Sequence, residues 1–357
     1  MNLDEARVLI DGRWQGNHGI ARCAREILSR LNIAEAQLIG RGSPTSLYDP
    51  VWLEIEVRRR RASLYYSPGF NPAAVFPRQL LTVHDLIHLS PRRHSLVHKI
   101  YYERLVKPAI RRMGTVLTVS HASQQRIEEW LRGRSVRIVN VGIACSDAFV
   151  SSGPIPDLQL PFAKDPYLLY VGNFKAHKNV NVALSAVVKI PDAQIVIVTD
   201  DAHSAREKVE ALGIAGRTLI LSNIADQTLA GIYRGAAALL MPSVEEGFGL
   251  PALEALCSGT SVLYWKGCDS VRQLAELYCD PVDSPTDVDE WTAAATCALE
   301  TPRSVEAGSL RQEFSWDAVA GRVRAVINDS CEAGSESCIA HTAATVLGSQ
   351  TEGVTCR

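Results

Sequence analysis

One stretch, residues 241–259 with the sequence MPSVEEGFGLPALEALCSG, constrains this chain more than any other. An apolar run leads into a loop with a Gly-Phe-Gly bend, and a proline then favours the first turn of a helix. This pattern predicts that Glu246 lies on the loop and Glu254 in that first turn. The amides of a helix N-terminus bind anions, and Gly247 and Gly249 let a ligand approach the backbone. Two carboxylates beside an anion site suit a ligand that carries vicinal hydroxyls and phosphate, such as a sugar nucleotide.

The rest of the chain alternates short apolar runs with helical patterns, which predicts parallel sheets covered by helices on both faces. Its 357 residues are enough for two cores. The strands are expected at 7–11, 63–67, 80–84, 115–119, 137–143, 167–171, 194–199, 218–222 and 261–265. A stretch rich in proline and small residues, 151–165, is the expected linker. The sequence therefore predicts two domains, 1–155 and 160–328, and a poorly ordered tail, 329–357.

The segment PS-x-EEGFGLPALEA-x-x-SG-x-x-V resembles, nearly position for position, the E-x7-E segment of retaining glycosyltransferases of family 4, the glycosyl transferases group 1. Without that context, the glutamates would more often be solvated loop charges and a favourable helix start. Further motifs extend the resemblance from residue 7 to about 328. It implies an α/β protein of the GT-B fold, in which two Rossmann-like doubly wound parallel-sheet domains face a cleft. The second domain would bind the nucleotide-sugar donor and the first the acceptor.

In the glutamate segment, the resemblance implies that Glu246 binds the hydroxyls of the transferred sugar and Glu254 the ribose. The loop between them would bind the sugar or the phosphate through its backbone: Gly247, Phe248, Gly249 and Leu250.

A strand followed by GNFKAHKNV resembles the family's loop for the donor diphosphate. Lys178 fits the lysine position, and a lysine neutralises phosphate as a point charge. His177 stands where arginine is usual, and Asn173 at another position where arginine occurs. Because histidine is only partly charged near pH 7, both weaker leaving-group stabilisation and a different donor are open. The Asn223–Ile224 turn is the implied place of the base.

In the first half, TVHDL resembles the family segment whose histidine reaches the donor sugar near the reacting carbon. This implies a catalytic place for His84 and Asp85, at the strand ends where open α/β sheets bind ligands. An isolated His-Asp pair is otherwise more often structural. The loop that holds Gly16 and Gly19 resembles the family's first loop, whose amides lie beside the transferred sugar and the acceptor. A tight strand-to-helix turn is the alternative.

Charge is divided unevenly between the two halves. Residues 1–160 hold 22 Lys and Arg against 14 Asp and Glu, whereas residues 161–357 hold 15 against 25. The asymmetry predicts that the first half meets an anionic surface, and no nucleic-acid-binding motif is visible, so lipid is favoured. The stretch 92–113 is either a basic amphipathic helix on that lipid or a sheet-covering helix with a solvated face.

No apolar run approaches the ~20 residues of a membrane span, and the acidic N-terminus does not resemble a signal peptide. The nine cysteines form no CxxC pair, which is typical of free thiols in a reducing compartment. We therefore expect a cytoplasmic protein that can lie peripherally on the inner face of the membrane.

No metal and no cofactor other than the substrate are expected. The Asp-x-Asp at Asp287–Asp289 follows a proline in a polar turn, where aspartate caps helices, and Asp200–Asp201 is also interpreted as a cap. With no His/Cys cluster either, Lys178 and helix amides would stabilise the leaving diphosphate.

The sequence thus predicts a metal-independent glycosyltransferase that moves a hexose, with retained configuration, to a growing, lipid-linked cell-surface polysaccharide. GDP-mannose is the first choice of donor and a UDP-hexose the second. A catalytically silent GT-B scaffold in a polysaccharide assembly complex stays open, because His177 and Gln273 depart from the family pattern. A nicotinamide-dependent oxidoreductase would need GxGxxG with an acidic residue ~20 positions on, and neither appears.

Overall fold

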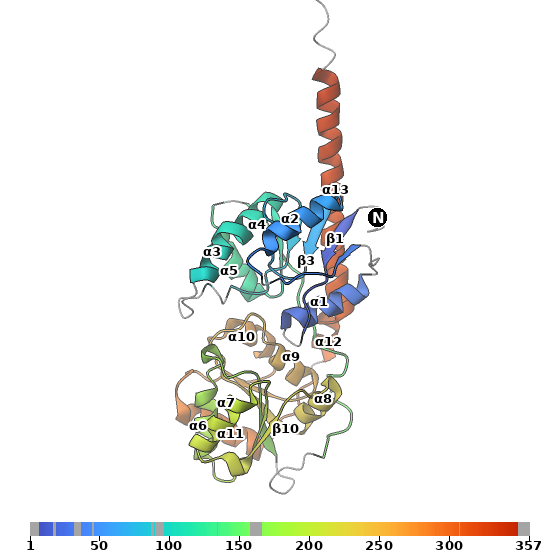
Figure 1. Cartoon of the computed structure of the whole chain (residues 1–357). Coiled ribbons are helices and arrows are strands. Elements are labelled where there is room, and N and C mark those ends of the chain that lie inside the picture. The colour runs from blue at the N-terminus through green and yellow to red at the C-terminus, as the bar shows by residue number, and fades with distance from the viewer. Residues whose placement is uncertain are drawn as a thin grey trace, which may run out of the picture.

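The computed structural model describes residues 7–16, 19–31, 37–44, 46–86, 89, 96–133, 135–157, 166–306 and 308–348, with side chains described as far as Glu332. Figure 1 shows two sets of α/β elements, one from each half of the chain, and a long C-terminal helix that runs along the first set. The expected linker lies partly outside the described residues, so the predicted domain boundaries stay a prediction.

The first half forms a four-stranded parallel sheet and a parallel pair, joined by a bridge between Thr82 and Leu117. The sheet has the order β2 (Leu38–Ile39), β1 (Val8–Asp11), β3 (Leu64–Ser67) and β4 (Gln79–Leu81), and the pair is β5 (Thr115–Thr118) and β6 (Arg137–Asn140). Its helices are α1 (Gly19–Arg30), α2 (Asp49–Arg59), α3 (Leu96–Tyr101), the π-helical η3 (Tyr102–Val106), α4 (Lys107–Met113) and α5 (His121–Leu131).

Residues of β1 alternate between two cores, as the period of two in a strand requires. Val8 and Ile10 pack in the core that contains Ile27 of α1, whereas Leu9 packs in the core that contains Leu53 of α2. Helices therefore cover both faces of this sheet, which confirms the prediction made from the alternating pattern.

The second half forms one five-stranded parallel sheet. Its order is β11 (Val262–Tyr264), β10 (Ala236–Met241), β7 (Tyr167–Val171), β8 (Ile195–Val198) and β9 (Thr218–Leu221). Around it lie η4 (Ala176–Lys178), α6 (Val180–Lys189), α7 (Ala202–Ala211), η5 (Ala215–Arg217), α8 (Asp226–Gly235), α9 (Leu250–Cys257), α10 (Asp269–Ala275), α11 (Val288–Glu300) and α12 (Gly308–Glu313). The central strands β7 and β10 are almost entirely buried, because helices cover both faces of a parallel sheet.

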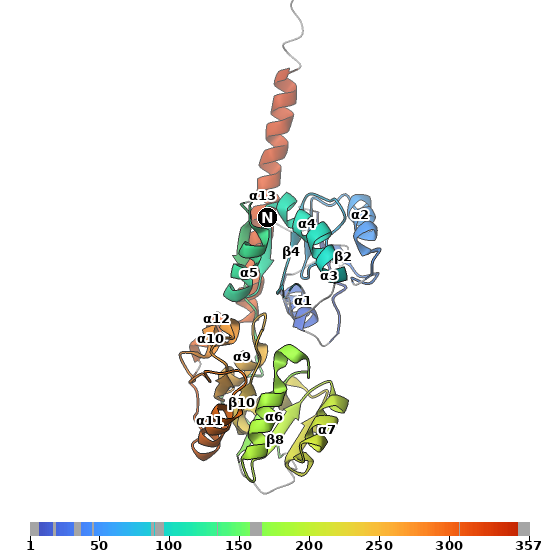
Figure 2. The ribbon, with the colours of Figure 1, turned by 90° about the vertical axis from the view of Figure 1, so that its left-hand side faces the viewer.

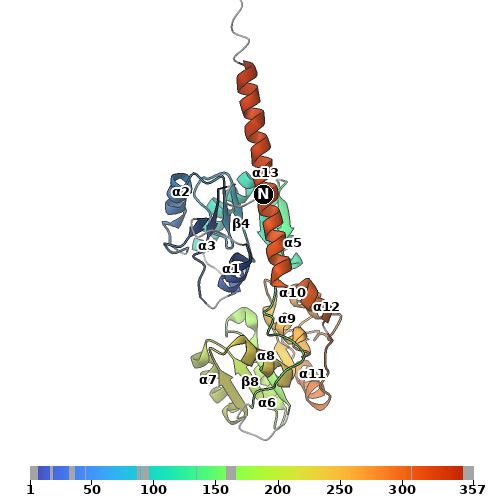
Figure 3. The ribbon, with the colours of Figure 1, turned by 90° about the vertical axis from the view of Figure 1, so that its right-hand side faces the viewer.

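The last helix, α13 (Trp316–Gly348), returns to the first half. Arg30 of α1 lies 2.9 Å from Asp317, and Arg322 donates to the carbonyl of Val141 at 2.7 Å. Residues 329–348, expected in a poorly ordered tail, continue this helix beyond the other elements (Figure 2 and Figure 3). The segment holds no proline, the residue that interrupts a helix most strongly, although Gly334 and its serines and threonines have low helix propensity.

The basic stretch predicted at 92–113 is helical from residue 96 onward, and residues 92–95 lie outside the described residues. Its hydrogen bonding widens to a π-helix at η3, just before Pro108, which has no N–H to donate and crowds the preceding turn. Ile110 is buried, whereas Leu96 and Ile100 are exposed, so the expected apolar stripe is split between core and surface. Among the described residues, no helix has the length and apolar character needed to cross a membrane.

Candidate functional site

Two loops follow the central strands of the five-stranded sheet and meet at its carboxyl edge. Lys178 ends η4, after β7, and Glu246 lies in the loop after β10. The Lys178 Nζ lies 2.6 Å from the Glu246 Oε1, and the two side chains are only 15% and 9% exposed. Open α/β sheets bind ligands at this edge. The structure thus brings the predicted diphosphate lysine and the predicted sugar glutamate together as a largely buried ion pair.

Backbone hydrogen bonds hold these two loops together. The amide of Val244 donates to the carbonyl of His177 at 2.9 Å, and the Ser270 hydroxyl donates to the carbonyl of Glu246 at 2.8 Å. The side-chain oxygen of Asn173 accepts from the amide of Lys175 at 3.2 Å. Asn173 and His177 therefore shape the loop, and their predicted contact with a diphosphate stays a prediction.

Helix α9 begins directly beside this ion pair. Gly249 precedes it with a φ of 101°, a left-handed conformation that favours glycine, and within the described residues no side chain caps its N-terminus. Phe248 is buried and packs against Phe314, with ring centroids 5.6 Å apart, which fixes the bend. Leu250 opens the helix, Pro251 has no N–H, and the amides of Ala252 and Leu253 donate to the carbonyl of Gly249. The amide of Leu250 is therefore the one in this first turn that can donate to an anion.

Segments of the first half pack against the glutamate loop. The hydroxyls of Ser120 and Ser123 lie 2.6 Å and 3.1 Å from the carbonyl oxygen of Gly247, and Ser123 also donates to the carbonyl of His84 at 2.7 Å. A Cβ on Gly247 would lie 2.8 Å from the Asp85 Oδ2, so the Asp85 side chain packs directly against this glycine. His84 is buried, and its ring nitrogen lies 2.8 Å from a backbone carbonyl oxygen. Asp85 therefore packs directly against the loop that holds Glu246, whereas His84 is linked to that loop through the hydroxyl of Ser123.

Glu254 lies in the second turn of α9, and the prediction of the first turn was wrong because the helix begins at Leu250. It is buried, and its two oxygens accept hydrogen bonds of 3.1 Å from Arg22 of α1 and from the hydroxyl of Tyr233. Arg22 also lies 2.8 Å from Asp226. This carboxylate thus links the two halves of the chain, and its predicted contact with ribose stays a prediction.

The buried Glu254 predicts a dependence of stability on pH. Burial raises its pKa to about 7 from the ordinary 4.5, and the Arg22 charge opposes that shift. Between these pH values the folded state holds a proton that the unfolded state has released, so the free energy of unfolding falls as pH rises, by about 3 kcal/mol. Urea denaturation from pH 4.5 to 8 should show this fall in the wild type, and a smaller one in Glu254→Gln.

The exposed Glu276, which pairs with Arg272 on the surface, offers a matched control. Glu276→Gln should keep the wild-type pH profile of stability. An unchanged profile in Glu254→Gln would contradict the role given to burial.

The glycine loop of the first half lies at the carboxyl end of β1. Gly16 is exposed with a φ of 112°, Gly19 begins α1, and the two residues between them lie outside the described residues. Next to this loop is a cavity of about 370 Å³ whose walls are Gly12, Trp14, Gln15, Gly16, Ala21, Arg25 and Leu28.

The Asn223–Ile224 turn follows β9 at the carboxyl edge of the other sheet, two strands from β7. The predicted ligand contacts of Gly16, Gly19, Asn223 and Ile224 stay predictions.

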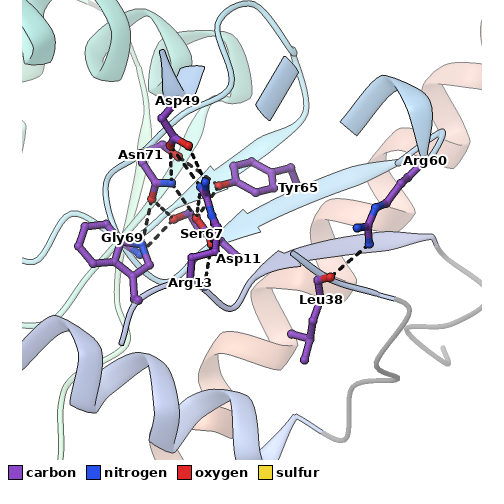
Figure 4. Close-up of polar contacts among 10 residues, drawn as sticks. Asp11, Arg13, Leu38, Asp49, Arg60, Tyr65, Ser67, Gly69 and Asn71 are labelled. Atoms are coloured by element: carbon purple, nitrogen blue, oxygen red, sulfur yellow. Dashed lines mark hydrogen bonds and ion pairs between the residues drawn. The ribbon is translucent and has the colours of Figure 1, made fainter. Parts of the chain in front are cut away.

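A buried polar network under the glycine loop was missed by the sequence analysis (Figure 4). Arg13 lies 2.8 Å from Asp11 and 2.5 Å from Asp49, and Asn71 donates to Asp11 at 2.7 Å. The indole of Trp14 in turn donates to Asn71 at 2.9 Å. The network therefore fixes the start of the loop. The available signal was a charged pair, Asp11 and Arg13, at the end of an apolar strand.

Both aspartate pairs weighed as metal ligands include a helix cap, as predicted. Asp287 accepts hydrogen bonds from two amides of α11, and Asp201 accepts one from Ser204 in α7. Within the part of the chain that the structure describes, no three His, Cys, Asp or Glu residues are grouped so as to hold a metal ion.

Comparison with known proteins places these features in context. Residues 157–307 match the family model described as Glycosyl transferases group 1. The chain is 28% identical over 274 residues to the O-antigen chain mannosyltransferase B of Escherichia coli, and the match covers 71% of each protein. It is 30% identical over 189 residues to the O-antigen chain mannosyltransferase RfbU of Salmonella typhimurium, covering 52% of this chain and 51% of that protein.

The fold also has counterparts among solved structures. WaaG, a glycosyltransferase involved in lipopolysaccharide biosynthesis, superposes with a TM-score of 0.63 at 15% identity, over 92% of this chain and 97% of that one. At that identity the likeness concerns the fold alone, and it covers both halves of the chain.

Proposed function

This chain is a glycosyltransferase of the GT-B fold whose residues 157–307 match the glycosyl transferases group 1, and we propose that it transfers mannose from GDP-mannose to a growing, lipid-linked cell-surface polysaccharide. The choice of mannose and of a polysaccharide acceptor is supported by the two O-antigen mannosyltransferases that the chain resembles. A UDP-hexose is the alternative donor.

The observation that carries this proposal is the Lys178–Glu246 pair beside the uncapped N-terminus of α9. A donor diphosphate at this edge would take Lys178 as its counter-ion, and the freed Glu246 would accept hydrogen bonds from sugar hydroxyls. The amide of Leu250, at the positive end of the α9 dipole, would donate to the same phosphate oxygens. Hydrogen-bond donors and cations that are held where negative charge develops stabilise the transition state. The bond from the anomeric carbon to the diphosphate oxygen therefore breaks more readily.

The proposed reaction retains the configuration at the anomeric carbon. The acceptor hydroxyl forms its bond on the face from which the diphosphate leaves, and its proton passes to the leaving phosphate. His84 and Asp85 lie on the first-half segment that contacts the Glu246 loop, so they are proposed to bind the sugar from the acceptor side. We propose no metal, because Lys178 and the α9 amides supply positive potential to the diphosphate.

Donor and stereochemistry can be tested with purified protein and a lipid-linked acceptor. GDP-mannose should support transfer, UDP-glucose and UDP-galactose should not, and proton NMR of the product should show the anomeric configuration of the donor. EDTA should leave the rate unchanged, and Glu246→Ala should abolish it. An inverted product would refute retention. A lack of transfer from every donor would favour the silent scaffold that His177 and Gln273 leave open.

We also propose that the first half lies peripherally on an anionic bilayer through α3. Leu96, Val97 and Ile100 are 74%, 65% and 62% exposed on this short helix, and Lys99 lies among them. Apolar side chains with neighbouring cations suit the interface of an anionic membrane.

Flotation with phosphatidylglycerol vesicles tests this contact. The double variant Leu96→Ser with Ile100→Ser should float several-fold less protein than the wild type. Leu277→Ser, which changes a leucine of the second half that is 84% exposed, should float as the wild type does. Equal flotation of all three proteins would rule out α3 as the contact.

A further inference from the structure

A second cavity, of about 300 Å³, lies at the amino edge of the first-half strands. Its walls come from the residues at the start of β4, β5 and β6 and from the end of α4 and the middle of α13: Pro77, Arg78, Arg112, Met113, Thr115, Arg137, Asp329 and Ser330. The strands are parallel, so this edge is opposite to the one that His84 and Asp85 follow. The cavity is therefore separate from the proposed transferase site.

Three arginines and one carboxylate face this cavity. Arg78 donates to the carbonyl of Ser330 at 2.7 Å, and Arg112 donates to the carbonyl of Ala74 at 3.1 Å. Each of these contacts uses one nitrogen of a guanidinium that has five N–H groups. Three guanidinium charges against one carboxylate leave the walls with an excess of positive charge.

The single carboxylate, Asp329, is held weakly. It lies 3.2 Å from Arg137, and the two side chains are 55% and 58% exposed. Ion pairs this exposed contribute little to stability. An anion with more than one charge can therefore replace Asp329 as the partner of Arg137.

From this arrangement we propose that the cavity binds a phosphoryl group, carried either by a soluble phosphate compound or by the headgroup of an anionic lipid. Guanidinium groups bind phosphate oxygens through paired N–H donors, and three of them from separate elements surround one space here. The cavity is several times larger than the ~30 Å³ that one water occupies in the liquid, so a phosphate or diphosphate has room. Bound there, it would tie α13 to β4 and β6.

A purely structural role makes a different prediction. If the arginines only hold α13 against the sheet, Asp329 is a favourable partner of Arg137. Removing its charge should then weaken the contact of α13 with the sheet without creating affinity for anions. If the cavity binds phosphate, Asp329 competes with the ligand, and its neutralisation should strengthen anion binding. Asp329→Asn therefore separates the two roles.

Calorimetric titration with inorganic pyrophosphate at low salt, in Lys178→Ala protein so that the donor site does not contribute, measures this binding. Arg78→Gln with Arg137→Gln should lower the affinity at least ~10-fold, because two charge-assisted contacts are lost. Asp329→Asn should raise it about threefold. Arg132→Gln, an exposed arginine outside the walls, should leave it unchanged. Thermal denaturation of each variant confirms that it is folded.

Vesicle flotation, with and without phosphatidylglycerol, identifies the source of the phosphoryl group. If the double arginine variant loses pyrophosphate binding but keeps its vesicle binding, the ligand is a soluble phosphate compound. Vesicle binding lost in the double arginine variant indicates a headgroup. The proposal is overturned if the double variant binds both probes as its parent does, or if Asp329→Asn weakens binding.

Discussion

Lys178→Ala is expected to lower kcat for sugar transfer about 100- to 1,000-fold, the loss typical of removing one preorganised donor at a developing charge. The Lys178 ammonium is the cation 2.6 Å from Glu246, and in the proposed reaction it becomes the counter-ion of the leaving diphosphate. Its removal also leaves Glu246 unpaired beside an anionic ligand, so donor affinity should fall as well. Steady-state kinetics with the preferred sugar nucleotide measures both effects.

Lys175 provides the matched control for this loop. It lies three residues before Lys178 and is exposed, so Lys175→Ala removes the same charge from the same loop without touching Glu246. Its kcat should stay within about twofold of the wild type. If Lys178→Ala also stayed within twofold, the lysine would not stabilise the leaving group.

Arg13→Met is expected to lower the free energy of unfolding by about 3–5 kcal/mol, because it leaves two buried carboxylates without their cation. The side chains of Arg13, Asp11 and Asp49 are all at most 3% exposed. Methionine keeps much of the volume, so the lost charge rather than a cavity dominates. Urea denaturation followed by circular dichroism measures the loss.

Arg58→Met is the control for a surface pair of the same type. Arg58 lies 2.5 Å from Glu54 with its side chain 63% exposed, so its replacement should cost less than about 1 kcal/mol. Adding Asp49→Asn to Arg13→Met should recover part of the loss, since one uncompensated charge disappears. Equal losses for Arg13→Met and Arg58→Met would show that the buried network does not stabilise the first half.

Local patterns were sufficient to predict most of the architecture. The strands around residues 167–171 and 218–222 are short apolar runs between turn residues, and they lie within a residue of those positions in β7 and β9. The proline beside Leu250 correctly predicted a helix start. Parallel sheets bury their strands on both faces, so each strand carries its own signal in the sequence.

The features that could not be predicted depend on segments far apart in the chain. Arg22 and Glu254 are 232 positions apart, and Ser120 and Gly247 are 127 apart, yet both pairs are in contact. No period or motif encodes which helix of one half meets which loop of the other. The length of α13 was not predicted for another reason, because residues 329–348 have neither hydrophobic periodicity nor high helix propensity.

The central claim is that Lys178, Glu246 and the Leu250 amide at the start of α9 together hold the diphosphate and sugar of a nucleotide donor. A crystal structure of the protein with GDP-mannose tests it most directly. The account predicts the diphosphate within hydrogen-bond distance of the Lys178 Nζ and the Leu250 amide, with the hexose hydroxyls on Glu246. Nucleotide bound elsewhere, with the 2.6 Å pair between Lys178 and Glu246 intact, would contradict it.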